Sequence, residues 1–165
     1  MSSVALQAGI LGAPLSPTLG LAGDHRTGHG FSLAIGLTWV VLPATEHLAA
    51  GGEAESRSAF VRVAPALDLG FGSFEVELGP ALAMGGERGT TAGLAESDVK
   101  VRAVAAAGAQ ASLRYDIAET LTLSLIGGAE APFRPFGGAF VVDGSEVLEP
   151  PLIRAFVAIG VGPTW

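Results

Sequence analysis

Apolar and polar residues alternate along most of this chain, and a period of two residues is the pattern of a β-strand. The alternation is clearest over residues 31–41, where the apolar face consists of Phe31, Leu33, Ile35, Leu37, Trp39 and Val41. The same pattern predicts strands over residues 4–11, 18–24, 31–41, 60–69, 74–84, 99–115, 121–131 and 152–165. Eight strands within 165 residues predict a single all-β domain spanning residues 1–165, an eight-stranded antiparallel up-and-down transmembrane β-barrel.

One segment also has helix propensity, because residues 103–111 are rich in alanine. Its polar neighbours Arg102, Gln110 and Arg114 keep an even spacing, which favours a strand. No run of about 20 apolar residues occurs, so a transmembrane helix is not expected.

The predicted connections differ in length. Residues 70–73 and 116–120 are short, whereas residues 42–57, 85–98 and 132–151 are long. Within the last of these, residues 141–147 predict a small hairpin on an Asp143-Gly144 turn. Short turns at one end and long loops at the other are typical of a membrane-spanning barrel. The first hairpin departs from this pattern, because its connection at the long-loop end, residues 12–17, is short.

The two faces of the predicted strands differ in charge. The apolar face carries none, and the other face carries small residues together with Arg62, Asp68, Glu75, Glu77, Arg102, Arg114, Glu130 and Arg154. Small residues suit the narrow interior of an eight-stranded barrel. A water-facing exterior would need many lysines, and the chain has one, Lys100. The apolar face is therefore predicted to face lipid, where a charge near the midplane costs about 2–4 kcal/mol.

Threading the strands alternately up and down divides the inward charges into two groups. Near the short turns we expect Arg114, Asp68, Glu75 and Glu77. Near the long loops we expect Arg62, Arg102, Arg154 and Glu130. Because buried charges need partners, these groups predict a structural ion-pair network that fills the interior. A gated ion or proton path is the alternative.

The same threading sorts the aromatic residues into two girdles, as at the two membrane interfaces. The short-turn girdle would contain Phe31, Phe71, Phe74, Tyr115 and Trp165. The long-loop girdle would contain Trp39, Phe60, Phe133 and Phe136.

Composition narrows the function classes. Charged residues make up 15% of the chain and the net charge is −7. This charge disfavours nucleic acid as a partner. The excess comes from predicted loops and ends, chiefly Glu46, Glu53, Glu55, Glu87, Glu96, Asp98, Asp143, Glu146 and Glu149. The first residues lack a signal-peptide pattern, and since such a barrel must be exported, we expect that a signal peptide has been removed or lies outside this sequence.

The last strand has one face that is apolar to the final residue, Trp165. Together with the other strands it resembles the small eight-stranded outer-membrane β-barrel proteins of Gram-negative bacteria. The resemblance implies a place in the outer membrane and contact with its lipid. It also implies that Val157, Ile159, Val161 and Trp165 form the signal for the barrel assembly machinery. Trp165 stands where Phe is commoner, and Pro163 takes a place usually held by an aromatic or aliphatic residue.

No motif supplies a reaction, a cofactor or a metal site. His25 and His29 lack a carboxylate third ligand, and the glycines at residues 85–89 lack the ending of a phosphate loop. The sequence therefore predicts a structural or interaction role, with a possible extracellular partner at the acidic loops. One alternative is a soluble lipocalin-like barrel that binds an apolar ligand. The other is an outer-membrane lipid hydrolase that uses His47, Glu46 and Ser56.

Overall fold

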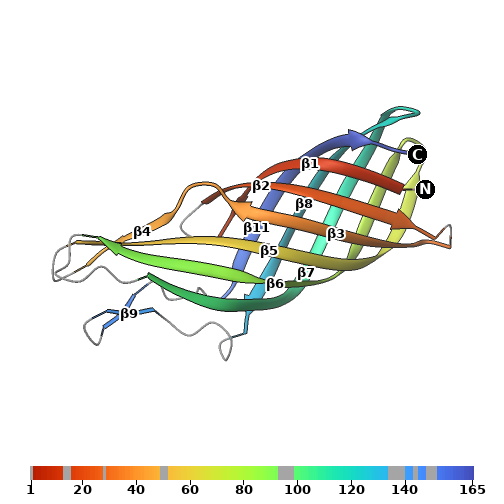
Figure 1. Cartoon of the computed structure of the whole chain (residues 1–165). Coiled ribbons are helices and arrows are strands. Elements are labelled where there is room, and N and C mark those ends of the chain that lie inside the picture. The colour runs from red at the N-terminus through yellow and green to blue at the C-terminus, as the bar shows by residue number, and fades with distance from the viewer. Residues whose placement is uncertain are drawn as a thin grey trace.

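Antiparallel pairing closes the chain into a barrel in the computed structural model (Figure 1). The structure describes residues 2–12, 16–27, 29–48, 52–92, 99–133, 140–142, 145–147 and 152–165. Eight strands form the ring in the order β3-β2-β1-β11-β8-β7-β6-β5, and pairing between β3 and β5 closes it. Their bounds are Ser2–Leu11 (β1), Ser16–Arg26 (β2), Phe31–Val40 (β3), Glu53–Phe71 (β5), Phe74–Ala92 (β6), Val99–Ala118 (β7), Leu121–Pro132 (β8) and Arg154–Pro163 (β11). The predicted fold is therefore confirmed, including a strand for the alanine-rich segment.

Three short strands lie outside the ring. Ala44–His47 (β4) pairs with the start of β5, and Phe140–Val142 (β9) pairs with Ser145–Val147 (β10). The small hairpin predicted in the last connection is thus present, and its Asp143-Gly144 turn lies outside the described residues. No helix in the described part of the chain is long and apolar enough to cross a membrane.

The apolar faces of the strands point outward and the small and polar faces point inward. Ile35, in the middle of β3, is 51% exposed, and its neighbours Leu33 and Leu37 are exposed as well. The interior is filled by buried alanines and hydroxyl residues, among them Ala64, Ala66, Ala81, Ala83, Ala106, Ser32, Ser112, Thr122 and Ser124. The predicted assignment of faces is confirmed. The lipocalin-like alternative is wrong, because it requires the apolar face to be internal.

The two ends of the barrel differ. At the short-turn end, β1 and β11 bring the termini together, with the Ser2 amide donating to the Trp165 carbonyl at 2.9 Å (Figure 1). The tight turn between β5 and β6 contains Gly72 at φ 68°, a left-handed backbone that glycine adopts without strain.

At the opposite end, β5, β6 and β7 continue far beyond their neighbours (Figure 1). Pairing runs up to Glu53 with Ala92 and Thr90 with Val99. We call residues 53–58 of β5, 87–92 of β6 and 99–102 of β7 the strand extension. The expectation of loops over residues 42–57 and 85–98 was therefore too broad. The period of two continues through these polar segments, so they extend the strands instead of ending them.

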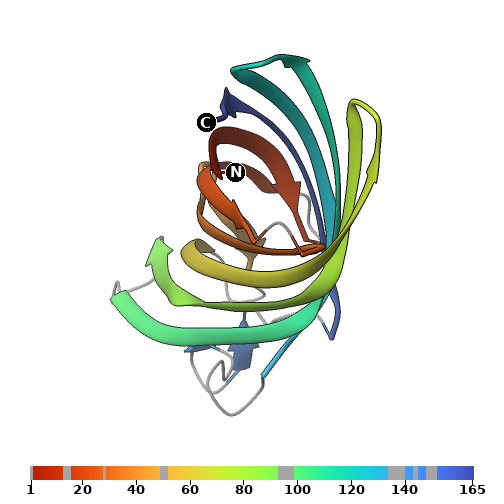
Figure 2. The ribbon, with the colours of Figure 1, turned by 90° about the vertical axis from the view of Figure 1, so that its right-hand side faces the viewer.

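The β9–β10 hairpin lies beside this strand extension (Figure 2), and the contacts of Phe140 with Gly89 and Arg102 place it on the inner face. Phe140 is buried and clusters with Ala54 and Leu48. Gly89 makes room for it, since a Cβ atom there would lie 2.9 Å from the Phe140 ring. One aromatic side chain thus holds the hairpin against the sheet.

Candidate functional site

The strongest concentration of chemistry lies in the barrel interior, where buried charges form ion pairs. Some of these pairs join neighbouring strands, and others join strands that are not neighbours. Near the long-loop end, Glu130 of β8 is 2% exposed and meets two arginines. Arg62 of β5 donates to one carboxylate oxygen at 3.0 Å, and Arg154 of β11 donates to the other through Nε at 2.8 Å. We call Arg62, Glu130 and Arg154 the upper cluster.

Two phenylalanines pack on the upper cluster. The Arg62 guanidinium lies 4.0 Å from the centroid of the Phe156 ring, and the Arg154 guanidinium lies 4.4 Å from that of Phe60. Both rings are buried. An aromatic face attracts a cation, and the effect is larger where water is excluded. Each guanidinium of the upper cluster therefore contacts both a carboxylate and an aromatic ring.

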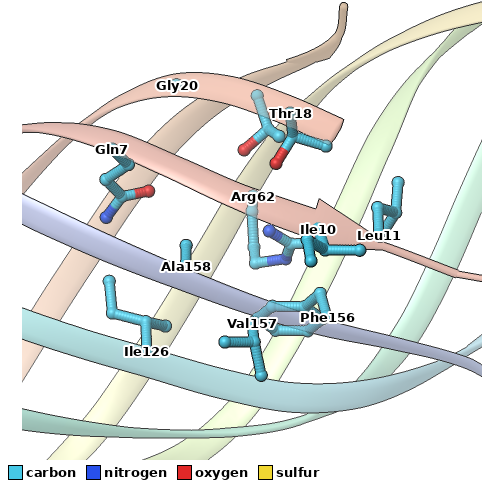
Figure 3. Close-up of a pocket in the computed structure, with 11 residues that line it drawn as sticks. Gln7, Ile10, Leu11, Thr18, Gly20, Arg62, Ile126, Phe156, Val157 and Ala158 are labelled. Atoms are coloured by element: carbon cyan, nitrogen blue, oxygen red, sulfur yellow. The ribbon is translucent and has the colours of Figure 1, made fainter. Parts of the chain in front are cut away.

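Small cavities adjoin the upper cluster. One of about 30 Å³ is lined by Gln7, Thr18, Arg62 and Phe156 among others (Figure 3). Another of about 40 Å³ shares Gln7 and Arg62 and extends to Gln110. A water molecule needs roughly 10–15 Å³ of such space, so these cavities suit a few waters but no organic ligand.

A second group of charges lies towards the short turns. Arg114 of β7 donates to Asp24 of β2 at 2.7 Å and to Glu77 of β6 at 3.1 Å. Ser3 donates to Asp24 and also accepts from Arg114. Arg26 pairs with Glu75 at 2.6 Å. We call Asp24, Arg26, Glu75, Glu77 and Arg114 the lower cluster.

A third ion pair occupies the inner face of the strand extension. Arg102 of β7 binds Glu87 of β6, its register partner, at 2.8 Å through Nε. The same guanidinium lies 4.3 Å from the centroid of the Phe140 ring. The charge of this pair therefore helps to seat the β9–β10 hairpin.

The structure changes several details of the predicted groups. Arg102 pairs with Glu87 and not with Glu130, because the strand extension carries it beyond the upper cluster. Asp68 makes no ion pair with the described residues, and its buried Oδ1 has no hydrogen-bond partner among them. Phe60 does not belong to an outer girdle, since its side chain is 2% exposed and points inward.

Three interior charges are not among the residues predicted for the network, namely Asp24, Arg26 and Glu87. A signal for them existed: Asp24 and Arg26 continue the even, inward positions of β2, and Glu87 continues the odd, inward positions of β6. Arg26 and Glu87 lie beyond the ends of the predicted strands, and Asp24 is the last residue of the predicted strand over residues 18–24. The other predicted aromatic residues within the described part of the chain are exposed, and Phe136 lies outside it.

The structure separates the residues of the lipid-hydrolase alternative, His47 and Ser56. His47 pairs with Glu53 at 3.2 Å on one face of the β4–β5 ribbon. Ser56 is buried and lies opposite Ala44, on the other face. The proposed base and nucleophile of a lipid hydrolase therefore point apart. The described residues contain no cluster of ligands that could hold a metal ion.

The last strand, β11, pairs along its full length with β8 and from Phe156 to Val161 with β1. Val157, Ile159, Val161 and Trp165 are all exposed on its outward face. Pro163 is the last residue of β11, at the end of pairing, where the missing N–H group costs least.

Comparison with protein-family models and with curated proteins gives no match. Solved structures do match. A major outer membrane protein from Thermus thermophilus superposes with a TM-score of 0.69 at 10% identity, covering 99% of each chain. Neisserial surface protein A gives 0.66 at 9% identity, covering 99% of this chain and 97% of that one.

Ail, the attachment invasion locus protein of Yersinia pestis, gives a TM-score of 0.60 at 9% identity, covering 98% of this chain and 95% of that one. A further structure of Ail is in complex with the heparin analogue sucrose octasulfate, with a TM-score of 0.54 at 10% identity over the same shares. At these identities the likeness concerns the fold. The chain has the eight-stranded fold of small outer-membrane β-barrels.

Proposed function

We propose that this protein spans the bacterial outer membrane as a barrel with a closed interior, and that it serves as a structural and interaction protein of the cell envelope. The observation that carries the proposal is the separation of the two faces. Exposed aliphatic side chains cover the outside of the ring, and the charges of the upper and lower clusters form ion pairs inside it. In water this arrangement would be unstable, whereas in lipid it is the favourable one.

The interior is proposed to be a packed network and not a conducting path. Support comes from the upper and lower clusters, which bridge opposite walls of the barrel at two levels. The two cavities beside the upper cluster are small. A narrow barrel filled in this way resists ion flow, because an ion would have to displace paired charges.

The long-loop end is proposed to face the outside of the cell and to contact a partner. The acidic residues Glu46, Glu53 and Glu55 of the β4–β5 ribbon support this proposal, since they lie beyond the barrel rim in water. Ail binds a sulfated heparin analogue, so a barrel of this fold can present a recognition surface. The negative charge of the β4–β5 ribbon instead favours a cationic partner, such as a basic peptide segment.

Membrane fractionation tests the central proposal. The protein is exported in a Gram-negative host, the membranes are separated by density, and folding is followed by heat-modifiable migration on electrophoresis. We expect the folded form in the outer-membrane fraction, with detergent needed for its extraction. A monodisperse protein in buffer without detergent would contradict membrane insertion.

Conductance tests the closed interior separately. In planar bilayers the purified protein is expected to give no sustained current steps above the lipid background. An Arg62→Ala/Arg154→Ala variant, which removes both cations of the upper cluster, serves as the comparison. Steady conductance of the unaltered protein would contradict the packed-network proposal while leaving membrane insertion intact.

A further inference from the structure

Two arginines stand directly opposite each other on the outward face of β5 and β6. Arg57 is the register partner of Arg88, and both side chains are exposed. Neither makes a hydrogen bond or ion pair with the residues that the structure describes. Like charges placed opposite each other in an antiparallel pair repel. The arrangement is therefore unfavourable, and an anion between the two guanidinium groups would relieve it.

The Arg57–Arg88 pair lies just beyond the edge of the apolar surface. Moving outward along the two strands, successive outward pairs are Val61 with Met84, Ala59 with Gly86, and Arg57 with Arg88. Trp39 is the partner of Ala59 on the other side, so the arginines lie one step beyond a tryptophan. Each step of two residues is about 6.6–6.8 Å along the strand. Glu55 and Glu53 follow further out.

This order places the positive charges between the apolar surface and the acidic ribbon. A tryptophan at the edge of an apolar belt marks the level of lipid headgroups. Arginine side chains just beyond that level can reach phosphate groups while their stems lie along apolar surface. The acidic residues stand farther from the lipid, where they do not oppose a bound phosphate as closely.

The other described arginines and the lysine do not lie on the outward face of the barrel. Five arginines form ion pairs inside the barrel or its extension, namely Arg26, Arg62, Arg102, Arg114 and Arg154. Lys100 occupies an inward position of β7, as the register partner of Gly89. Among the described residues, Arg57 and Arg88 are thus the outward basic pair.

We propose that Arg57 and Arg88 together bind a phosphate group of an anionic lipid in the outer leaflet, an inference that rests on the proposed membrane insertion. Each guanidinium can donate two parallel hydrogen bonds to phosphate oxygens. Val101, the register partner of Arg88 on β7, is 74% exposed and offers an apolar contact beside the charge. An amphipathic lipid satisfies both features, whereas free phosphate satisfies only one.

Titration of lipid A into the protein in zwitterionic micelles tests the proposal. Folding of each variant is first verified by heat-modifiable migration. Since a basic residue near an anionic surface contributes about fivefold to affinity, Arg57→Gln/Arg88→Gln is expected to weaken the apparent Kd by about 25-fold. Each single variant should lose about fivefold. Raising the salt concentration should weaken binding to the unaltered protein more than to the double variant.

Lys100→Gln is the matched control, since it removes one positive charge from the other face of the strand extension. It should leave the apparent Kd for lipid A unchanged. Equal affinity of the unaltered protein and the double variant would overturn the assignment. Inorganic phosphate is titrated in parallel, and binding of phosphate as tight as that of lipid A would instead identify a free-anion site. Failure of the unaltered protein to insert into bilayers would refute the proposed function itself.

Discussion

Arg62 and Glu130 join opposite sides of the barrel interior, because their side chains meet at 3.0 Å although two strands, β6 and β7, separate β5 from β8 in the ring. Contacts between neighbouring strands follow from register. The contact between Arg62 and Glu130 instead depends on closure of the barrel. Variants at these residues therefore test how much the interior charges contribute to the stability of the barrel.

Removing the shared carboxylate should destabilise the barrel strongly. Glu130→Gln leaves the Arg62 and Arg154 guanidinium groups without a counter-charge in a buried setting. Loss of one partner of a buried ion pair costs about 3–5 kcal/mol. The free energy of unfolding by urea in lipid vesicles measures the effect. Glu53→Gln, on the exposed ribbon, should change it little, and equal effects of the two variants would contradict the network.

The lower cluster should show coupling between its members. Arg114→Ala leaves Glu77 without its cation and leaves Asp24 with only the longer ion pair to Arg26, at 3.5 Å. It is therefore expected to lower the free energy of unfolding by about 3–5 kcal/mol. Adding Asp24→Asn removes one stranded charge and should recover part of that loss. A double-mutant cycle with urea unfolding gives the coupling energy. Unchanged thermal stability of Arg114→Ala would refute the pairing role.

The apolar exterior should reject charge in a position-dependent way. Ile35→Arg introduces a cation in the middle of the outward face of β3 and should cost about 2–4 kcal/mol in a bilayer. Val99→Arg places a cation on the outward face of the strand extension, beyond the apolar exterior of the ring. It should lower the free energy of unfolding by about 0–1 kcal/mol. Unfolding in vesicles compares them, and similar costs for both would argue against the proposed membrane level.

Filling the space at Gly89 should release the hairpin without unfolding the barrel. A Val side chain there would occupy the position of the Phe140 ring, which lies 2.9 Å from the site of its Cβ atom. Hydrogen exchange at residues 140–147 should become faster in Gly89→Val, while exchange in β7 and β8 stays unchanged. Phe140→Ala should give the same pattern, because it removes the other partner of the contact.

The last residue should matter for assembly in cells more than for stability. Trp165 is 67% exposed, and its backbone already pairs with Ser2. Trp165→Ala is therefore expected to refold in detergent with little loss, while the amount of folded protein in the outer membrane of a host falls. Trp165→Phe should retain assembly. Equal yields of Trp165→Ala and the unaltered protein would argue against the proposed signal.

Much of the fold could be predicted from the alternation itself. The side chains of a strand change face at every residue, so residues 31–41 already define which side of β3 is apolar, and the near absence of lysine indicates that this side does not meet water. The number of ring strands follows in the same way. Strand ends were predicted less well, because the strand extension near Arg57 and Glu87 is polar and resembles a loop when hydrophobicity is the guide.

The interior partners could not be predicted from the sequence by itself. Alternation shows that Arg102 and Glu130 point inward, but their heights in the barrel depend on the register of several successive strands. Pairing of β6 with β7 fixes Arg102 opposite Glu87, and closure between β3 and β5 sets which walls face each other. The sequence thus determined which residues enter the interior, and the tertiary structure decided which of them meet, since register and closure are properties of the assembled sheet.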